Sequence, residues 1–311
     1  MVDGADNFAK LPHGMTTRTR NRLITVFILL FPFVLFTGFL IFRTSGPLPP
    51  ILPLPNPNGY DDLVKAGQMV SSNSWNYEHM DAAQLRETVS ANAAALALAR
   101  TGLTQECRVP LQFSQRYIEG HLAELADLKR LAQAFMAEGW LAEAKGSLGD
   151  AAATYLDLVR LGDNSARGGV LIDALVGVAI DHMGVAGLQK ITGQLDAKSC
   201  REAATTLETL ATQRQTWADM LQQEHAWSRR TFPGIRYRLG ELVMFSSTSK
   251  ARQKAGQKFA EQEKKIRQLT VDLAARAYEL EKGHRPASSA DLVPDYLKAI
   301  PQDPITGNNL N

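Results

Sequence analysis

Two aspartates in the most apolar stretch of the chain are the first candidates for chemistry. Asp173 and Asp181 lie on roughly one side of a predicted helix, with Gly177 between them. Carboxylates held in apolar surroundings can act as general acids or bases. If they converged with His182 or Glu138, the chain would be an enzyme. The alternative interpretation is that each aspartate caps a helix or forms a salt bridge with a neighbouring one.

Other catalytic or metal-binding patterns are weak. His121 and Glu124 are three residues apart, whereas di-iron bundles use the opposite order, Glu-x-x-His, and use it twice. The sequence has no His-Glu-x-x-His, Cys-x-x-Cys, Gly-x-Ser-x-Gly or Gly-x-Gly-x-x-Gly motif. We therefore predict neither a metal nor another cofactor, and no catalytic residues.

The chain has two cysteines, Cys107 and Cys200. In an oxidising compartment a disulfide between them would close a long loop, worth about 4–5 kcal/mol in the chain-entropy model. The alternative is a pair of buried free thiols.

An uncharged run of twenty residues, from Leu23 to Phe42, predicts how the chain is held in place. As a helix it would be about 30 Å long, which matches the hydrocarbon core of a bilayer. Arg18, Arg20 and Arg22 precede the run, which favours a cytoplasmic N-terminus and an extracytoplasmic bulk. We expect a single-pass protein of the bacterial inner membrane, with a cleaved signal peptide as the alternative.

The sequence thus divides into five segments. They are a basic cytoplasmic tail (1–22), a transmembrane helix (23–43), a Pro-rich linker (44–59), a helical domain (60–248) and a long helix with a C-terminal tail (249–311). The prolines of the linker favour polyproline II, a stiff spacer of about 34 Å over Pro47 to Pro57. A flexible tether is the alternative.

Charge is distributed unevenly along the chain. Beyond Arg43 there are 29 Lys and Arg against 30 Asp and Glu, which argues against a nucleic-acid-binding protein. The segment from Ser228 to Arg276 nevertheless has twelve basic and four acidic residues. Four lysines in it recur at helical spacing: Lys250, Lys254, Lys258 and Lys265. We expect this stripe to contact an acidic surface, unless it is simply a solvated helix face.

Helical periodicity runs through almost all of the segment after the linker. Apolar residues recur at intervals of three and four, and Ala, Leu, Glu, Gln and Arg are abundant. We predict an all-α domain, an irregular helical bundle with a central apolar helix at 164–192. The other expected helices are 61–72, 81–101, 114–139, 146–161, one of about 30 residues from 199, and 250–281, with 235–248 less regular.

One hairpin resembles a tetratricopeptide repeat. Gly139, Gly146, Ala151 and Tyr155 fall at the spacings where that family packs two helices against each other. The resemblance implies that the aromatic ring fills the gap left by small residues. Only one such unit occurs, so the chain is expected to have a TPR-like hairpin. Gly177 and Gly184, seven residues apart, would allow another close helix contact.

The C-terminal tail has its own pattern. Gly283 should stop the long helix, Ser288 or Ser289 should cap a short one, and Asp303-Pro304 and Thr306-Gly307 should form turns. The apolar residues Leu292, Val293, Tyr296, Leu297 and Ile300 would dock on the preceding helix.

This tail resembles the C-terminal region of G-type pseudopilins of type II secretion, and that of membrane-anchored proteins of planctomycete-type bacteria. The resemblance implies a calcium site in some members, for which Asp303 is the candidate here. The N-terminus departs from pseudopilins: Gly14 is followed by Met15-Thr16-Thr17-Arg18, and no acidic residue enters the apolar run.

From these observations we expect a membrane-anchored, non-enzymatic scaffold or protein-interaction module in the cell envelope. Its partners would be the lipid bilayer, through Leu23 to Phe42, and a protein. One alternative is an accessory component of a type II secretion or pilus-like system. The second is an enzyme that uses Asp173 and Asp181.

Overall fold

The computed structural model describes residues 31, 38, 48–71 and 80–310, with the backbone alone at 235–248. The chain divides into two units, Met1–Pro50 and Ile51–Asn311. All helices named below belong to the second unit. The predicted transmembrane helix lies outside the described residues except for Phe31 and Gly38, and the basic tail lies outside them entirely.

The second unit is built from α-helices. They are α2 (Gly59–Met69), α3 (Ala82–Ala91), α4 (Ala93–Leu103), α5 (Tyr117–Ala144), α6 (Leu148–Ala166), α7 (Leu171–Ile191), α8 (Ala197–Gln213), α9 (Trp217–Thr231) and α10 (Ile235–Lys282). Two short 3-10 helices, η2 (Thr192–Gln194) and η3 (Ser289–Leu292), complete the set. Within the described ranges no strand is formed, only an isolated bridge between Gln302 and Asn309. The predicted all-α class is confirmed.

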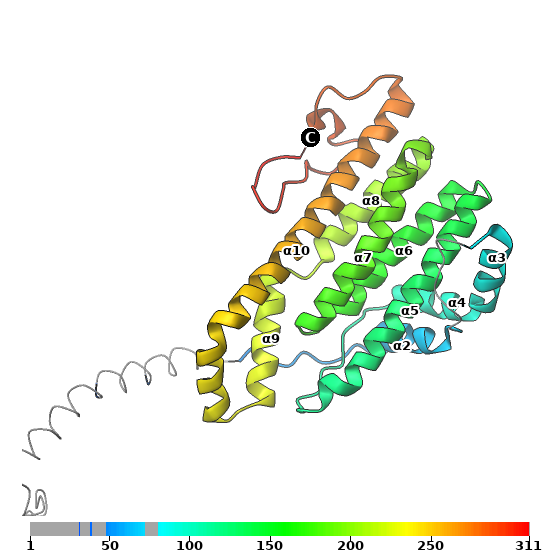
Figure 1. Cartoon of the computed structure of the whole chain (residues 1–311). Coiled ribbons are helices and arrows are strands. Elements are labelled where there is room, and N and C mark those ends of the chain that lie inside the picture. The colour runs from blue at the N-terminus through cyan, green and yellow to red at the C-terminus, as the bar shows by residue number, and fades with distance from the viewer. Residues whose placement is uncertain (1–30, 32–37, 39–47, 72–79, 311) are drawn as a thin grey trace, which may run out of the picture. The chain divides into compact units, whose positions relative to one another are not determined.

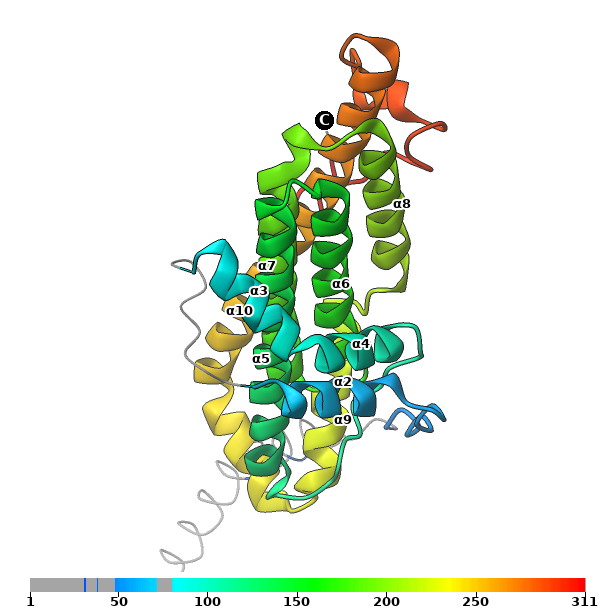
Figure 2. The same cartoon turned by 90° about the vertical axis from the view of Figure 1, so that its right-hand side faces the viewer.

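Three long helices, α5, α6 and α7, form the centre of the unit (Figures 1 and 2). Helices α2, α3 and α4 pack on the outer side of α5, while α8 and α10 pair with each other beside α6 and α7. The core between them is mostly Leu, Ile, Val and Ala, with Phe135 and Tyr155 as its largest fully buried rings in the central helices.

Tyr155 of α6 lies between two glycines on neighbouring helices. A Cβ atom at Gly139 of α5 would overlap its ring, and one at Gly187 of α7 would lie 2.6 Å from ring carbon Cδ1. The turn between α5 and α6 passes through Gly146, whose φ of 74° suits glycine. The expected packing of Tyr155 against Gly139 is confirmed, whereas Gly146 lies in the turn and an added Cβ there would meet nothing within 4 Å.

Helices α6 and α7 approach each other through glycine as well. A Cβ atom at Gly177 would lie 2.6 Å from the carbonyl oxygen of Gly162 and 2.9 Å from Cβ of Ala166. One at Gly184 would lie 2.6 Å from the carbonyl oxygen of Tyr155. The expected close contact through Gly177 and Gly184 is therefore confirmed, and α6 is its partner.

Two helices expected to be continuous are interrupted. The prediction of one helix over 81–101 is wrong, because Asn92 separates α3 from α4. Its buried side chain bonds the carbonyl of Thr88 and accepts a hydrogen bond from the backbone N–H of Ser71, at 2.9 Å each. This side chain ties the α3–α4 junction to the end of α2.

The single helix expected after Ser199 is also wrong, since α8 ends at Gln213 and α9 starts at Trp217. Thr216 caps α9 with Asp219, and Arg214 turns inward at the break. Likewise α6 extends to Ala166, so the apolar helix begins only at Leu171.

The long C-terminal helix starts earlier than predicted. The backbone of 235–248, expected to be less regular, is helical and continuous with the rest of α10. The helix ends at Gly283, whose φ is 77°, as expected. Ser288 caps η3, and the apolar tail residues Leu292, Tyr296 and Leu297 are buried in the core cluster. The predicted docked helix and loop are confirmed.

Among the described helices, α7 with η2 (Leu171–Gln194) is apolar and long enough to span a bilayer. Half of its most apolar window is buried within the protein. Its aspartates, Asp173 and Asp181, are also buried and paired with other helices. These contacts agree with the predicted role of a central core helix.

We expect Gly177→Ala to destabilise the protein by about 1–3 kcal/mol, because the new methyl group overlaps the α6 backbone. This loss should outweigh alanine's helix propensity, which is about 1 kcal/mol better than that of glycine. The matched control is Gly120→Ala in α5, where an added Cβ meets nothing within 4 Å. Chemical unfolding of the purified chain measures both. Equal stability of the two variants would contradict the close contact.

Candidate functional site

Asp173 and His121 form a buried pair between α7 and α5. The ring nitrogen Nε2 of His121 lies 2.5 Å from Oδ1 of Asp173, and Nδ1 lies 2.9 Å from Oε2 of Glu124. Asp173 is fully buried, and the His121 side chain is 1% exposed. Because both ring nitrogens face carboxylate oxygens, a doubly protonated imidazolium satisfies both contacts.

The pair is also integrated into local structure. The second oxygen of Asp173 accepts the backbone N–H of Val170 at 2.7 Å, which caps the first turn of α7. Tyr117 stacks on the His121 ring with 4.8 Å between centroids, and the hydroxyl of Tyr60 donates to Glu124. Neighbouring aromatic and backbone groups thus hold the imidazole in one orientation.

Burial alone would lower the pKa of His121. The hydrogen bond and charge of Asp173, with those of Glu124, outweigh burial and raise the pKa of His121 above its usual value. Burial next to the same carboxylates raises the pKa values of Tyr60 and Tyr117, so these hydroxyls stay neutral. These shifts favour a charged ion pair between His121 and Asp173.

Asp181 belongs to a different cluster. Nη2 of Arg214 lies 2.8 Å from Oδ2 of Asp181 and 2.5 Å from Oδ1 of Asp163 on α6. All three side chains are at most 10% exposed. Burial raises the pKa of both carboxyls. The positive charge of Arg214 lowers both pKa values, but it is shared between two carboxyls and does not offset the effect of burial. This cluster fastens α6, α7 and the α8–α9 break together.

Asp173 and Asp181 do not converge with His182 or Glu138. Asp173 meets His121, Asp181 meets Arg214, Glu138 pairs with Arg100, and His182 is exposed. The alternative interpretation, that they cap helices or form salt bridges, is confirmed for both. The sequence offered one clue to the His121 pair, a histidine on the apolar stripe of α5.

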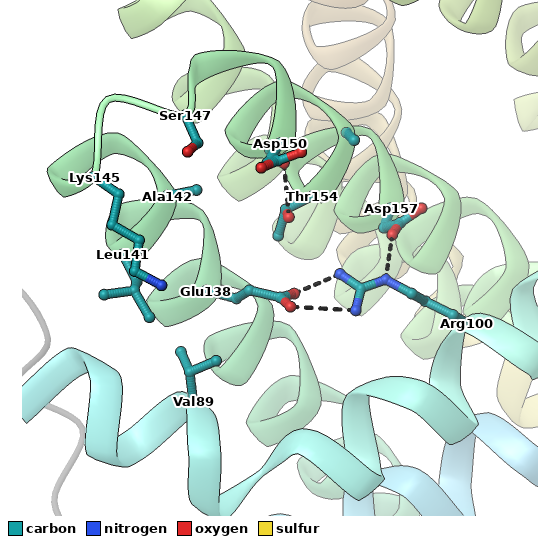
Figure 3. A pocket seen from close by; sticks show the side chains of 11 residues that line it. Val89, Arg100, Glu138, Leu141, Ala142, Lys145, Ser147, Asp150, Thr154 and Asp157 are labelled. Atoms are coloured by element: carbon teal, nitrogen blue, oxygen red, sulfur yellow. Dashed lines mark hydrogen bonds and ion pairs between the residues drawn. The ribbon is translucent and has the colours of Figure 1, made fainter.

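A polar cleft of about 360 Å³ lies between α4, α5 and α6 (Figure 3). Arg100 lines this cleft, and its guanidinium lies 2.5 Å from the carboxylate of Glu138 and 3.0 Å from that of Asp157. Figure 3 shows the guanidinium turned toward both carboxylates. An anionic ligand would have to displace carboxylates from Arg100, so the cleft is a poor candidate for binding.

A larger and more apolar groove lies between α3, α5 and α7. Its volume is about 610 Å³. Three methionines and a tryptophan dominate the lining, which comprises Met80, Leu85, Met136, Trp140, His182, Met183, Ala186, Gly187 and Lys190. We call it the methionine groove. It is the best candidate for a binding site on the described part of the chain.

The methionine groove has a buried base and an ion pair at one rim. Leu85 is buried with Ala137 and Leu141 in a small cluster of its own. Nζ of Lys190 lies 2.7 Å from Oε2 of Glu143 at the rim. Methionine side chains are unbranched and polarizable, so they adapt to apolar partners of varied shape. The groove combines a fixed base with adaptable walls.

The predicted basic stripe lies on α10, where all four lysines are exposed. We call Lys250, Lys254, Lys258 and Lys265 the lysine face. Within the described part of the chain none of them forms an ion pair, whereas nearby Lys264 pairs with Asp303 at 2.8 Å.

The remaining candidates are engaged inside the protein. Cys107 and Cys200 are free, buried thiols rather than a disulfide. Burial raises their pKa to about 12 and about 11, which makes both poorly reactive. Asp303, the calcium candidate, accepts from Lys264 and from the backbone of Ile305, and these contacts lower its pKa to about 2.

Among the described residues, no three His, Cys, Asp or Glu side chains are grouped as metal ligands. Asp303 in particular already accepts from a lysine, where a calcium site would gather six to eight oxygens.

Comparisons with known proteins identify no homologue of the chain. No protein-family model matches the chain, and neither a curated protein nor a solved structure shows significant similarity to it.

The His121–Asp173 pair predicts a pH-dependent stability. Because the pKa of His121 is raised in the folded state, its contribution is complete below the unfolded value of about 6.5. The contribution should disappear as the pH rises through the raised value. Urea unfolding measured from pH 6 upward should show this fall, and His121→Gln should remove that step.

The same substitution tests the cost of an unpaired buried carboxylate. His121→Gln leaves Asp173 without its cation and should cost about 3–5 kcal/mol. His182→Gln, at an exposed position of α7, is the control and should change stability by less than about 0.5 kcal/mol. If both variants unfold alike, His121 does not stabilise Asp173.

Proposed function

We propose that the chain is a membrane-anchored, non-enzymatic interaction module that binds an apolar segment of a protein partner in the cell envelope. The observation that carries this proposal is the methionine groove. Among the described residues it is an apolar groove formed by three helices that pack into the core.

The chemistry of the groove favours an amphipathic helix as its occupant. Helix-binding grooves take a row of apolar side chains at intervals of three and four residues, and Met and Trp serve as adaptable anchors. A volume of about 610 Å³ accommodates several such side chains. The exposed side chains of His182 and Lys190 would meet polar residues at the edge of that helix.

The buried acids and bases support a role without catalysis. Asp173 pairs with His121, Arg214 pairs with Asp163 and Asp181, and each cluster joins separate helices. Pairing raises the pKa values of His121 and Arg214, and burial raises the pKa of Asp181; structural ion pairs also produce such shifts.

Location follows from the sequence. The uncharged run from Leu23 to Phe42 and the arginines before it favour a single-pass inner-membrane anchor with the helical unit outside the cytoplasm. The near-neutral charge of the rest of the chain favours a protein partner over nucleic acid. The alternative, an accessory role in type II secretion, rests on the C-terminal tail and would be revealed by the identity of the partner.

We expect Ala186→Arg to reduce recovery of the partner at least about tenfold, a loss of about 1.4 kcal/mol. Ala186 is exposed in the groove, so the arginine occupies the binding space without disturbing the core. The matched control is Ala97→Arg, at an exposed position of α4 outside the groove. Quantitative co-purification from detergent-solubilised membranes compares them with the wild type.

Two outcomes would count against the groove. The first is that the wild-type chain recovers no stoichiometric partner. The second is that Ala186→Arg and Ala97→Arg recover the partner equally well, which would place the binding surface elsewhere.

The anchor has its own test. Because an apolar helix of about 30 Å is stable only in hydrocarbon, alkaline carbonate should leave the intact chain in the membrane pellet. Protease added to spheroplasts should digest the C-terminal region. Release by carbonate, or protection of the C-terminus, would contradict the proposed topology.

A further inference from the structure

The lysine face is the most basic exposed surface row on α10. Taking 100° and 1.5 Å per residue, the four lysines lie within an arc of about 80° and extend over about 22 Å. Glu261 lies in the same arc and is also exposed, so the row has a net charge of +3. The row ends before Asp272, where α10 presents acidic residues instead.

Three other basic residues of α10 are paired with acidic residues. Lys264 pairs with Asp303, Arg267 pairs with Glu263, and Arg276 pairs with Glu279. The lysine face has no such partner among the described residues. Its charge is therefore available to an external group.

We propose that the lysine face binds the phosphate headgroups of anionic lipids in the membrane that anchors the chain. This inference rests on the proposed membrane anchor. The acidic surface expected to contact the lysine face is then the layer of lipid phosphates.

The surroundings of the lysines favour lipid over an acidic protein. Stable protein interfaces depend on buried aromatic or apolar anchors. The exposed neighbours here are Gln253, Gln257 and Ala251, and the exposed large apolar side chains of the described residues lie elsewhere. Lysine is a compact, hydrated charge without the bidentate geometry of arginine, which suits attraction to a layer of mobile phosphates.

The linker keeps the helical unit close to such a surface. Nη1 of Arg108 donates to the carbonyl oxygen of Pro53 at 2.8 Å, so the linker is fastened to the unit from Pro53 onward. Ten residue steps join Arg43 to Pro53, so their Cα atoms lie at most about 36 Å apart. A short tether raises the effective concentration of headgroups, so that weak individual contacts suffice.

The test uses the full chain in vesicles and a fluorophore on Gln257→Cys, between Lys254 and Lys258. Labelling is selective because the native thiols are buried. Quenching by headgroup-spin-labelled lipid is compared in phosphatidylcholine vesicles with and without phosphatidylglycerol. We expect phosphatidylglycerol to raise the ratio of surface-bound to free helix by on the order of tenfold, about 1.4 kcal/mol. The increase should disappear at about 1 M salt.

Two quadruple variants provide matched controls. In the first, all four lysines of the lysine face are changed to Gln, and the increase in quenching should be lost. In the second, four exposed lysines scattered elsewhere are changed to Gln, namely Lys65, Lys129, Lys145 and Lys298. This variant has the same change in net charge and should keep the increase.

The outcomes separate this inference from the proposed anchor. Loss of the chain from the vesicles after a carbonate wash overturns the anchor. A retained chain with equal quenching in both lipid compositions, or equal loss in both quadruple variants, overturns lipid binding. A third outcome is that quenching is absent in vesicles while the lysine face is protected from amine labelling in native membranes. That outcome would identify an acidic protein as the partner and would also overturn lipid binding.

Discussion

The close approach of α6 and α7 is the constraint on which most of this structure depends. Gly177 and Gly184 let the α7 backbone lie directly against α6, with no room for a side chain between them. At this distance Asp163 of α6 and Asp181 of α7 face the same buried space. A cation is then required, and Arg214 supplies it from the break between α8 and α9. Helix packing, the buried triad and the interrupted helix are thus parts of one arrangement.

Charged residues in the core join helices that would otherwise be held by apolar contacts alone. His121 and Asp173 connect α5 to the first turn of α7, and Arg214 connects α6 to α7. Apolar contacts tolerate small shifts between helices, whereas an ion pair with fixed hydrogen bonds does not. Such pairs therefore keep α5 and α7 in register, and these two helices form walls of the methionine groove.

The surfaces left for function have unlike chemistry. The methionine groove is apolar and depends on the α3, α5 and α7 arrangement, so an occupant would be recognised by shape and hydrophobic area. The lysine face depends on α10 alone, and its attraction to phosphate is electrostatic and sensitive to salt. One unit could therefore rest on a lipid surface and hold a partner protein at the same time.

Local patterns in the sequence determined most of the helical segments and the end of α10 at Gly283. They also determined the docking of the C-terminal tail and the exposure of the four lysines. These features could be predicted because periodicity and capping act over a few residues. The same patterns missed the breaks at Asn92 and Arg214. Those side chains bond to segments distant in sequence, so only the tertiary structure shows why the helices stop. The tertiary structure also decided the partner of Asp173, which is His121, 52 residues away in the sequence. It likewise assembled the methionine groove from three helices. A property set by neighbours along the chain can be predicted from sequence, whereas one set by neighbours in space requires the packing to be known.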